Sequence, residues 1–129
     1  RLLPAIEGLK IGISTDPDAN YGPVVTAAHR ERVEHYIQMG VDEGAKLVVD
    51  GRGFSLQGYE KGFFIGPTLF DRVEPHIQSY REEIFGPVLQ IMRARTVEEA
   101  VRLPSQHQYG NGVAIFTRNG QAAREFAQR

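Results

Sequence analysis

Two adjacent carboxylates and an aromatic ring lie close together in the segment Tyr80–Val88, and these residue types can bind a sugar and a flat ring. An ionised carboxylate such as Glu82 or Glu83 only accepts hydrogen bonds, so it suits a sugar diol whose two hydroxyls can both donate. Phe85 can supply a flat apolar wall against a ring. The simpler interpretation is a solvated loop whose glutamates pair with Arg81 or cap a turn, because charged side chains are mostly exposed. The residues alone leave both interpretations open.

The four histidines are the other candidates for chemistry, as metal ligands. His29 and His35 are six residues apart on one expected helix, about 240° around its axis, so they cannot meet at one ion. His76 and His107 lie in separate expected loops, without a His or carboxylate at ligand spacing. We therefore expect no metal site, and solvated surface positions for these side chains.

The composition is that of an ordinary globular domain. The chain has 129 residues, of which 41% are hydrophobic and 24% charged, and 15 Lys+Arg against 16 Asp+Glu give a formal charge of −1. A chain of this length is expected to form a single domain, 1–129. The near-zero charge favours neither nucleic acid nor an anionic membrane as a partner, and no apolar run approaches the roughly 20 residues of a membrane span. The absence of cysteine excludes disulfides, thiolate metal sites and a cysteine nucleophile within the chain.

The strongest helical pattern predicts a helix over residues 26–43. Thr26 is a suitable N-cap, and Gly44 can end the helix in the left-handed conformation. Apolar or small side chains recur at the spacing of one buried helical stripe: Val33, Tyr36, Ile37, Gly40 and Val41.

Short runs rich in Val, Ile and Leu predict strands at 46–50 (buried), 68–73, 88–92 and 112–117, with an extended segment at 9–13. Thr96 and Glu99 match a capping box, which begins a helix that should end before Pro104. Asn119 should cap a last helix. Because helices alternate with these strands, the expected fold class is α/β, with a largely parallel sheet covered by helices.

Four stretches in register resemble the aldehyde dehydrogenase superfamily, and together they cover nearly the whole chain. Glu82-Glu83-Ile-Phe-Gly-Pro-Val88 resembles the Glu-Glu-x-Phe-Gly-Pro signature of the family. The other three are the Gly-Pro segment at 22–30, the Gly-Phe-Phe stretch at 62–69 and the late strand at 109–117. The details of 26–30 and 109–117 look most like methylmalonate-semialdehyde dehydrogenases, which are acylating enzymes.

The resemblance implies roles for two residues. Glu83 matches the residue that grips the nicotinamide ribose hydroxyls of NAD, and Phe85 matches the aromatic ring packed beside the nicotinamide. It also implies a covalent mechanism, in which a cysteine thiolate attacks the aldehyde and the thioester is released to coenzyme A or water. Because this chain has no cysteine, we expect no catalytic residue in it and no aldehyde oxidation by the chain alone. The expectation is a C-terminal part of the catalytic domain, without the dinucleotide-binding half, the nucleophile segment or the oligomerisation tail.

For the parent protein, the resemblance implies a small-molecule aldehyde substrate, coenzyme A and a homo-oligomer. The apolar runs at 63–70 and 112–117 are expected to leave exposed surface that favours association. By analogy, the compartment would be the cytoplasm in a bacterium and the mitochondrial matrix in a eukaryote. The alternative is a non-catalytic α/β module that binds a partner or assists assembly, because composition and periodicity alone fit both.

Overall fold

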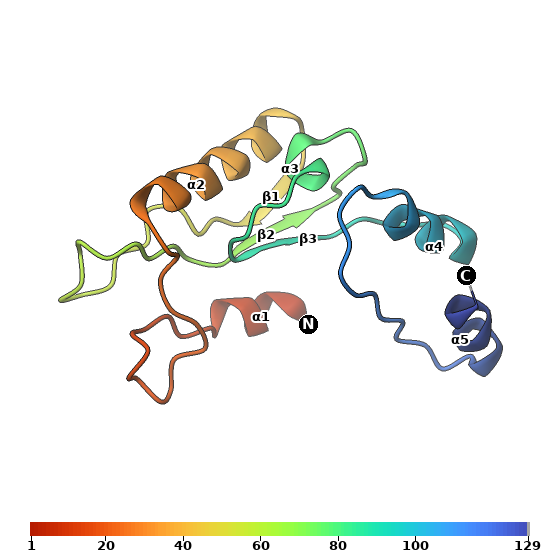
Figure 1. Ribbon diagram of the computed structural model, residues 1–129, viewed down its shortest axis with the longest axis horizontal. Helices are drawn as coiled ribbons and strands as arrows, with labels where there is room; N and C mark the ends of the chain where they lie inside the picture. Colours follow the sequence, from red (N-terminus) through yellow and green to blue (C-terminus); the bar gives the residue numbers. More distant parts are fainter. Residues whose placement is uncertain (129) are drawn as a thin grey trace. The chain divides into compact units, whose positions relative to one another are not determined.

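The computed structural model describes residues 1–128, which form two compact units, Arg1–Met92 and the part from Arg93 onward (Figure 1). In chain order, the first unit contains α1 (Leu2–Glu7), α2 (Ala27–Asp42), β1 (Lys46–Val49), β2 (Thr68–Asp71), α3 (Gln78–Arg81) and β3 (Val88–Gln90), and the second contains α4 (Val97–Gln106) and α5 (Gly120–Ala127). Two compact units can belong to one domain, so the single domain expected over 1–129 stays a prediction.

Helix α2 forms where its sequence pattern predicts a helix. The Thr26 hydroxyl oxygen accepts a hydrogen bond from the His29 amide at 3.1 Å, which satisfies one of the free donors of the first turn. At the other end Gly44 has φ +97°, the left-handed conformation that stops a helix. Val33 and Ile37 are fully buried, so the predicted apolar stripe faces the core.

The sheet has the order β1-β2-β3 and is mixed. Strands β2 and β3 pair in parallel, with Thr68 opposite Val88, whereas β1 and β2 pair antiparallel. The α/β class is therefore confirmed, but only one of the two strand pairs is parallel. The β1–β2 connection contains no helix, and a crossover between parallel strands is usually a helix. As an edge strand β1 is also only half-buried on alternate residues, not buried throughout as predicted.

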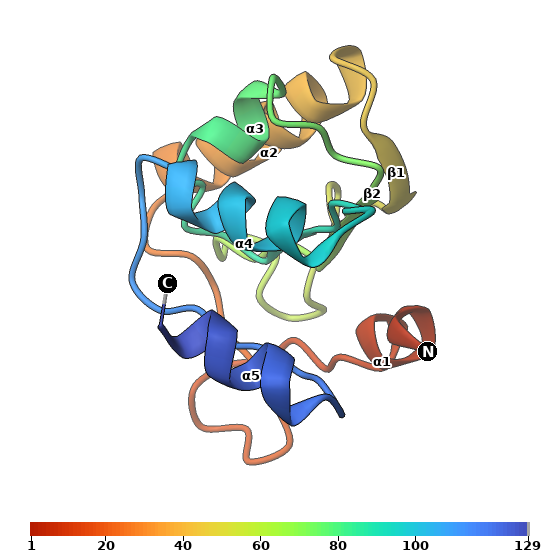
Figure 2. The ribbon, with the colours of Figure 1, turned by 90° about the vertical axis from the view of Figure 1, so that its right-hand side faces the viewer.

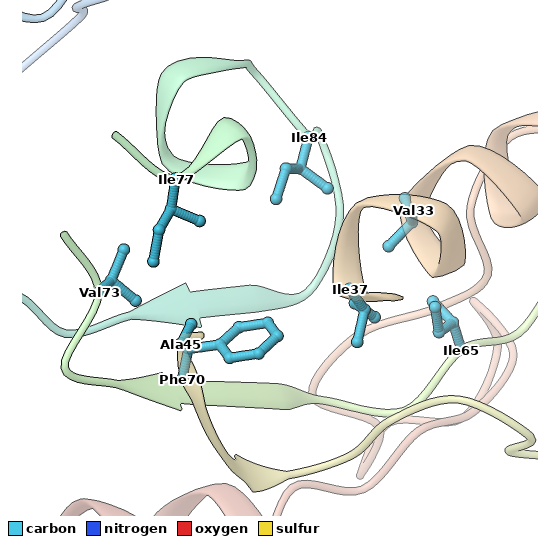
Figure 3. Packing of buried hydrophobic residues seen from close by; sticks show 8 residues of the cluster. All are labelled: Val33, Ile37, Ala45, Ile65, Phe70, Val73, Ile77 and Ile84. Atoms are coloured by element: carbon cyan, nitrogen blue, oxygen red, sulfur yellow. The ribbon is translucent and has the colours of Figure 1, made fainter. Parts of the chain in front are cut away.

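The core lies between the sheet and the helices α2 and α3, which lie side by side over one of its faces (Figures 1 and 2). Phe70 of β2 is fully buried and lies in one cluster with Ile37 of α2 and Ile77, the N-cap residue of α3 (Figure 3). The buried cluster consists of Val33, Ile37, Ala45, Ile65, Phe70, Val73, Ile77 and Ile84. Each Val, Ile or Phe side chain of this cluster contributes about 1.5–3 kcal/mol by burial. Ile77 and Ile84 attach α3 and the loop that follows it to this core.

The largest difference from the sequence prediction is at 112–117, which forms no strand. Phe116 is 97% exposed and Val113 62% exposed. A strand requires a neighbour for its backbone hydrogen bonds, and within residues 1–128 no strand pairs with this segment. The segment at 9–13 likewise makes only one bridge, between Ile11 and Tyr21, and α1 was not predicted from the sequence.

The helices of the second unit begin at the predicted caps. The Asn119 side chain accepts from the amides of the first turn of α5, and the Thr96 hydroxyl accepts from the Glu99 amide at 3.1 Å. The reciprocal bond of the capping box differs, because Glu99 accepts from the Arg95 amide at 2.9 Å. Helix α4 also continues through Pro104. Beyond the proline, Ser105 Oγ donates to the Val101 carbonyl at 2.9 Å, which supports the last turn.

Candidate functional site

Glu83 and Phe85 lie on the loop between α3 and β3, on either side of a buried residue. Ile84 is 8% exposed and belongs to the core, while both neighbours are exposed. The chain leaves α3 in an extended conformation at Glu82, with φ −110° and ψ 153°. With Ile84 in the core, its two neighbours Glu83 and Phe85 face solvent.

The backbone of Phe85 has φ +53°, in the left-handed region that residues other than glycine rarely adopt. Such a conformation costs on the order of 1 kcal/mol and persists only where the surroundings impose it. Phe85 is also 71% exposed, so its own side chain gains little burial in return. The flanking residues must impose the conformation.

Gly86 allows the loop to approach helix α2 closely. A Cβ atom at this position would lie 2.7 Å from Cγ2 of Val33, nearer than real Cβ contacts. On the far side of Gly86, the Thr68 amide donates to the Pro87 carbonyl at 2.8 Å, which fixes the loop to β2. With Ile84 in the core, these contacts hold Phe85 between two anchored positions.

The two glutamates differ in their contacts. Glu82 is half-buried, and its Oε1 accepts a hydrogen bond from Gln78 Nε2 at 2.9 Å. Glu83 is exposed, and its carboxylate makes no hydrogen bond or ion pair with any of residues 1–128. The exposure of Glu83 fits a solvated loop as well as a ligand-binding position, and the partner of Glu82 is Gln78. The Glu83 carboxylate keeps all its acceptor positions for a ligand.

A hollow of about 270 Å³ lies beside Phe85. Its lining residues are Ser79, Tyr80, Glu82, Ile84, Phe85, Gly86, Val88 and Gln90. Two buried oxygens among them, Ser79 Oγ and Gln90 Oε1, have no hydrogen-bond partner within residues 1–128, and burial raises the pKa of the Tyr80 phenol. The surface next to Phe85 is therefore concave and partly polar.

Sequence reasoning missed one contact of this loop. His29 is half-buried, and its Nε2 lies 3.4 Å from the carbonyl oxygen of Ile84, so its expected position as a solvated surface side chain is wrong. The signal was present in the helix prediction, because His29 precedes Val33 by four residues and so shares its face of α2.

The described residues contain no set of side chains suited to a metal ion. Within 1–128 no group of three or more His, Cys, Asp or Glu side chains could hold one. No helix in this range is long and apolar enough to cross a membrane. The chain contains no cysteine, so it supplies no thiolate nucleophile, and the exposed Glu83 carboxylate and Phe85 ring stay candidates for binding a ligand.

The sequence of this chain is similar to one protein family and to proteins of known name. A family model described as "Aldehyde dehydrogenase family" matches residues 1–129. The malonate-semialdehyde dehydrogenase of Pseudomonas aeruginosa is 54% identical over 126 residues, which are 98% of this chain and 25% of that protein. The acylating, mitochondrial methylmalonate-semialdehyde dehydrogenase of Arabidopsis thaliana is 48% identical over 126 residues, which are 98% of this chain and 21% of that protein.

The fold is also similar to that of a solved structure. The crystal structure of a Sinorhizobium meliloti protein, described as a methylmalonate-semialdehyde dehydrogenase complexed with NAD, matches with a TM-score of 0.96 and 58% identity. The match covers 99% of this chain and 26% of that one. The chain thus spans about a quarter of the length of the relatives it matches.

Proposed function

Because the chain belongs to the aldehyde dehydrogenase family, we propose that Glu83 holds the nicotinamide ribose of NAD and that Phe85 packs beside the nicotinamide ring. The observation that carries this proposal is the exposed carboxylate of Glu83, which has no partner among residues 1–128. A carboxylate held in an internal ion pair would have fewer acceptor positions open to the two hydroxyls of a ribose. The proposed binding of the ribose therefore depends on the unoccupied acceptor positions of the Glu83 carboxylate.

Glu83 would bind the ribose through charge-assisted hydrogen bonds. Each contributes about 1.5–3 kcal/mol when sheltered, because the two hydroxyl donors meet an ionised acceptor. When bound, NAD supplies the hydride acceptor for aldehyde oxidation. The residues of this chain orient the cofactor.

Phe85 would limit the positions open to the nicotinamide ring. Its ring stands out from the loop with 71% of its surface exposed, and the backbone that carries it is fixed by Ile84 and Gly86. Because the backbone that carries the Phe85 ring is already fixed, less conformational entropy is lost when a ligand binds against the ring.

The parent protein would oxidise a short semialdehyde and transfer the acyl group to coenzyme A. This proposal follows the names of the relatives, a malonate-semialdehyde dehydrogenase and an acylating methylmalonate-semialdehyde dehydrogenase. Since this chain contains no cysteine, the thiolate that this chemistry requires would come from elsewhere in a longer parent, and the chain alone would not oxidise aldehydes. Assembly of the parent into a homo-oligomer is part of the same proposal, as is location in the mitochondrial matrix or the bacterial cytoplasm.

The test is Glu83→Gln in a parent polypeptide of the relatives' full length that carries this sequence. Loss of the charge should weaken NAD binding by about tenfold, measured by titration calorimetry, and should slow NADH formation. The matched control is Glu82→Gln, because Glu82 already has Gln78 as a partner and should affect NAD binding far less. Unchanged cofactor affinity and rate in Glu83→Gln would contradict the proposed role and favour a non-catalytic module.

A further inference from the structure

We propose that His29 is a positioning residue for the loop Glu82–Val88, here called the cofactor loop, and that it acts by holding the carbonyl of Ile84. This inference rests on the function proposed for Glu83 and Phe85. Its starting point is the 3.4 Å distance between Nε2 of His29 and the Ile84 carbonyl oxygen. The carbonyl can only accept a hydrogen bond, so the bond requires a proton on Nε2.

The Ile84 carbonyl is the group that can control Phe85. A peptide unit is planar, so the carbonyl oxygen of Ile84 and the amide nitrogen of Phe85 turn together. A side chain that holds this oxygen therefore restricts the torsion φ of Phe85, which has the uncommon value of +53°. His29 thus acts on the backbone torsion that sets the direction of the Phe85 ring, without contact to the ring.

Helix α2 contacts the cofactor loop at two successive turns. Val33 packs against Gly86, and His29, one turn earlier, reaches Ile84, so the two contacts lie on either side of Phe85. The far end of α2 holds α3 instead, because Glu43 Oε2 accepts a hydrogen bond from the Gln78 amide at 2.5 Å. The His29 bond can therefore be removed without loss of the contact that fixes α3.

The positioning role of His29 predicts that replacing His29 and replacing Glu83 change different measured quantities. Glu83 should govern the affinity for NAD, since it would hold the ribose. His29 should govern the hydride-transfer rate, since the Phe85 ring limits where the nicotinamide lies and a small misplacement of reacting groups slows a reaction. The two residues are thus distinguishable by which measured quantity their replacement changes.

The experiment compares two replacements of similar size in the full-length parent. His29→Gln keeps an N–H donor near the position of Nε2, whereas His29→Met has none. We expect His29→Met to slow single-turnover NADH formation by about two- to tenfold with little change in NAD affinity, and His29→Gln to restore most of the rate. Equal rates in the two variants would overturn the proposal. Glu43→Ala removes the acceptor for the Gln78 amide, so it is the control for general loosening of α2 against α3, and it should not give this pattern.

A second measurement uses this chain and needs no activity. In the NMR spectra of His29→Met, the resonances of the Ile84 carbonyl and the Phe85 amide should shift, and in His29→Gln they should return toward those of the original chain. Thermal unfolding of each variant shows whether it is folded. If Glu83→Gln leaves cofactor binding unchanged while these resonances move, the proposed function fails and the positioning contact stands. If the resonances do not move in His29→Met, the positioning role is wrong whatever the cofactor result.

Discussion

The cofactor loop and the segment Gly112–Thr117 both carry a phenylalanine beside an isoleucine but have very different surroundings. Both combine glycine with apolar and aromatic residues. The cofactor loop is anchored, because Ile84 is in the core and Gly86 lies against α2. Within Gly112–Thr117, Phe116 is 97% exposed, and a Cβ atom at Gly112 would meet nothing within 4 Å. An exposed aromatic ring on a fixed backbone can present a binding surface. The backbone of Gly112–Thr117 has no comparable contacts among the described residues to fix it.

The same contrast separates the helices of the two units. Helix α2 places Val33 and Ile37 in full burial. Helices α4 and α5 also carry apolar residues on one face, but neither contains a buried residue. A hydrophobic stripe shows which face of a helix can be covered. Whether it is covered depends on the other surfaces present, and the sequence of the helix does not contain that information.

The largest effect should distinguish two phenylalanines. Phe70→Ala removes a fully buried ring and should lower the free energy of unfolding of the first unit by about 3–5 kcal/mol. Phe116→Ala removes a ring that is 97% exposed, and the change should stay within about 0.5 kcal/mol. Denaturant unfolding followed by circular dichroism measures both. A large loss in Phe116→Ala would show that the second segment is covered in solution, and the contrast would fail.

A smaller effect should distinguish two glycines. Gly86→Ala would place a Cβ atom 2.7 Å from Val33 and should cost about 1–3 kcal/mol of stability through overpacking. Gly112→Ala is the matched control, because nothing lies within 4 Å of its Cβ position. The double variant Gly86→Ala with Val33→Ala should recover part of the combined loss, since it removes the clashing methyl groups. Strict additivity in this cycle would mean that Gly86 does not pack against α2 as described.

The smallest effect concerns two threonine caps. Thr26→Ala and Thr96→Ala each remove a side-chain acceptor at a helix start, at a cost of about 1 kcal/mol. In α2, which is part of the core, the loss should appear in the unfolding free energy of the first unit. In α4, which has no buried residue, it should appear as faster amide exchange within that helix, since local opening then dominates. If the two variants changed amide exchange equally in α2 and α4, the helices of the two units would not differ in local stability as described.

The sequence predicts best where local chemistry decides the outcome. The start of α2 at Thr26, its end near Gly44 and the cap at Asn119 are set by side-chain and backbone properties within a few residues. The strand expected at 112–117 depends on a neighbouring strand, and none pairs with it among the described residues. A period-2 or apolar pattern cannot supply that neighbour.

For the candidate site, the sequence indicates the proposed ligand-binding residues but not the contacts that support them. Glu83 and Phe85 were identified by resemblance, and the structure adds that Glu83 has no partner among residues 1–128 and that Phe85 has φ +53°. The contact of His29 with Ile84 joins residues 55 positions apart. Only the packing of α2 against the cofactor loop reveals it.

Because the backbone at position 85 is left-handed, the residue that would make this chain most stable there differs from the residue that the proposed function needs. Glycine adopts that conformation without the steric cost that phenylalanine bears, so selection for stability alone would favour loss of the aromatic ring. Consensus or thermostability engineering of this segment would then tend to remove the feature that we assign to cofactor placement, as happens where function depends on a locally unfavourable geometry.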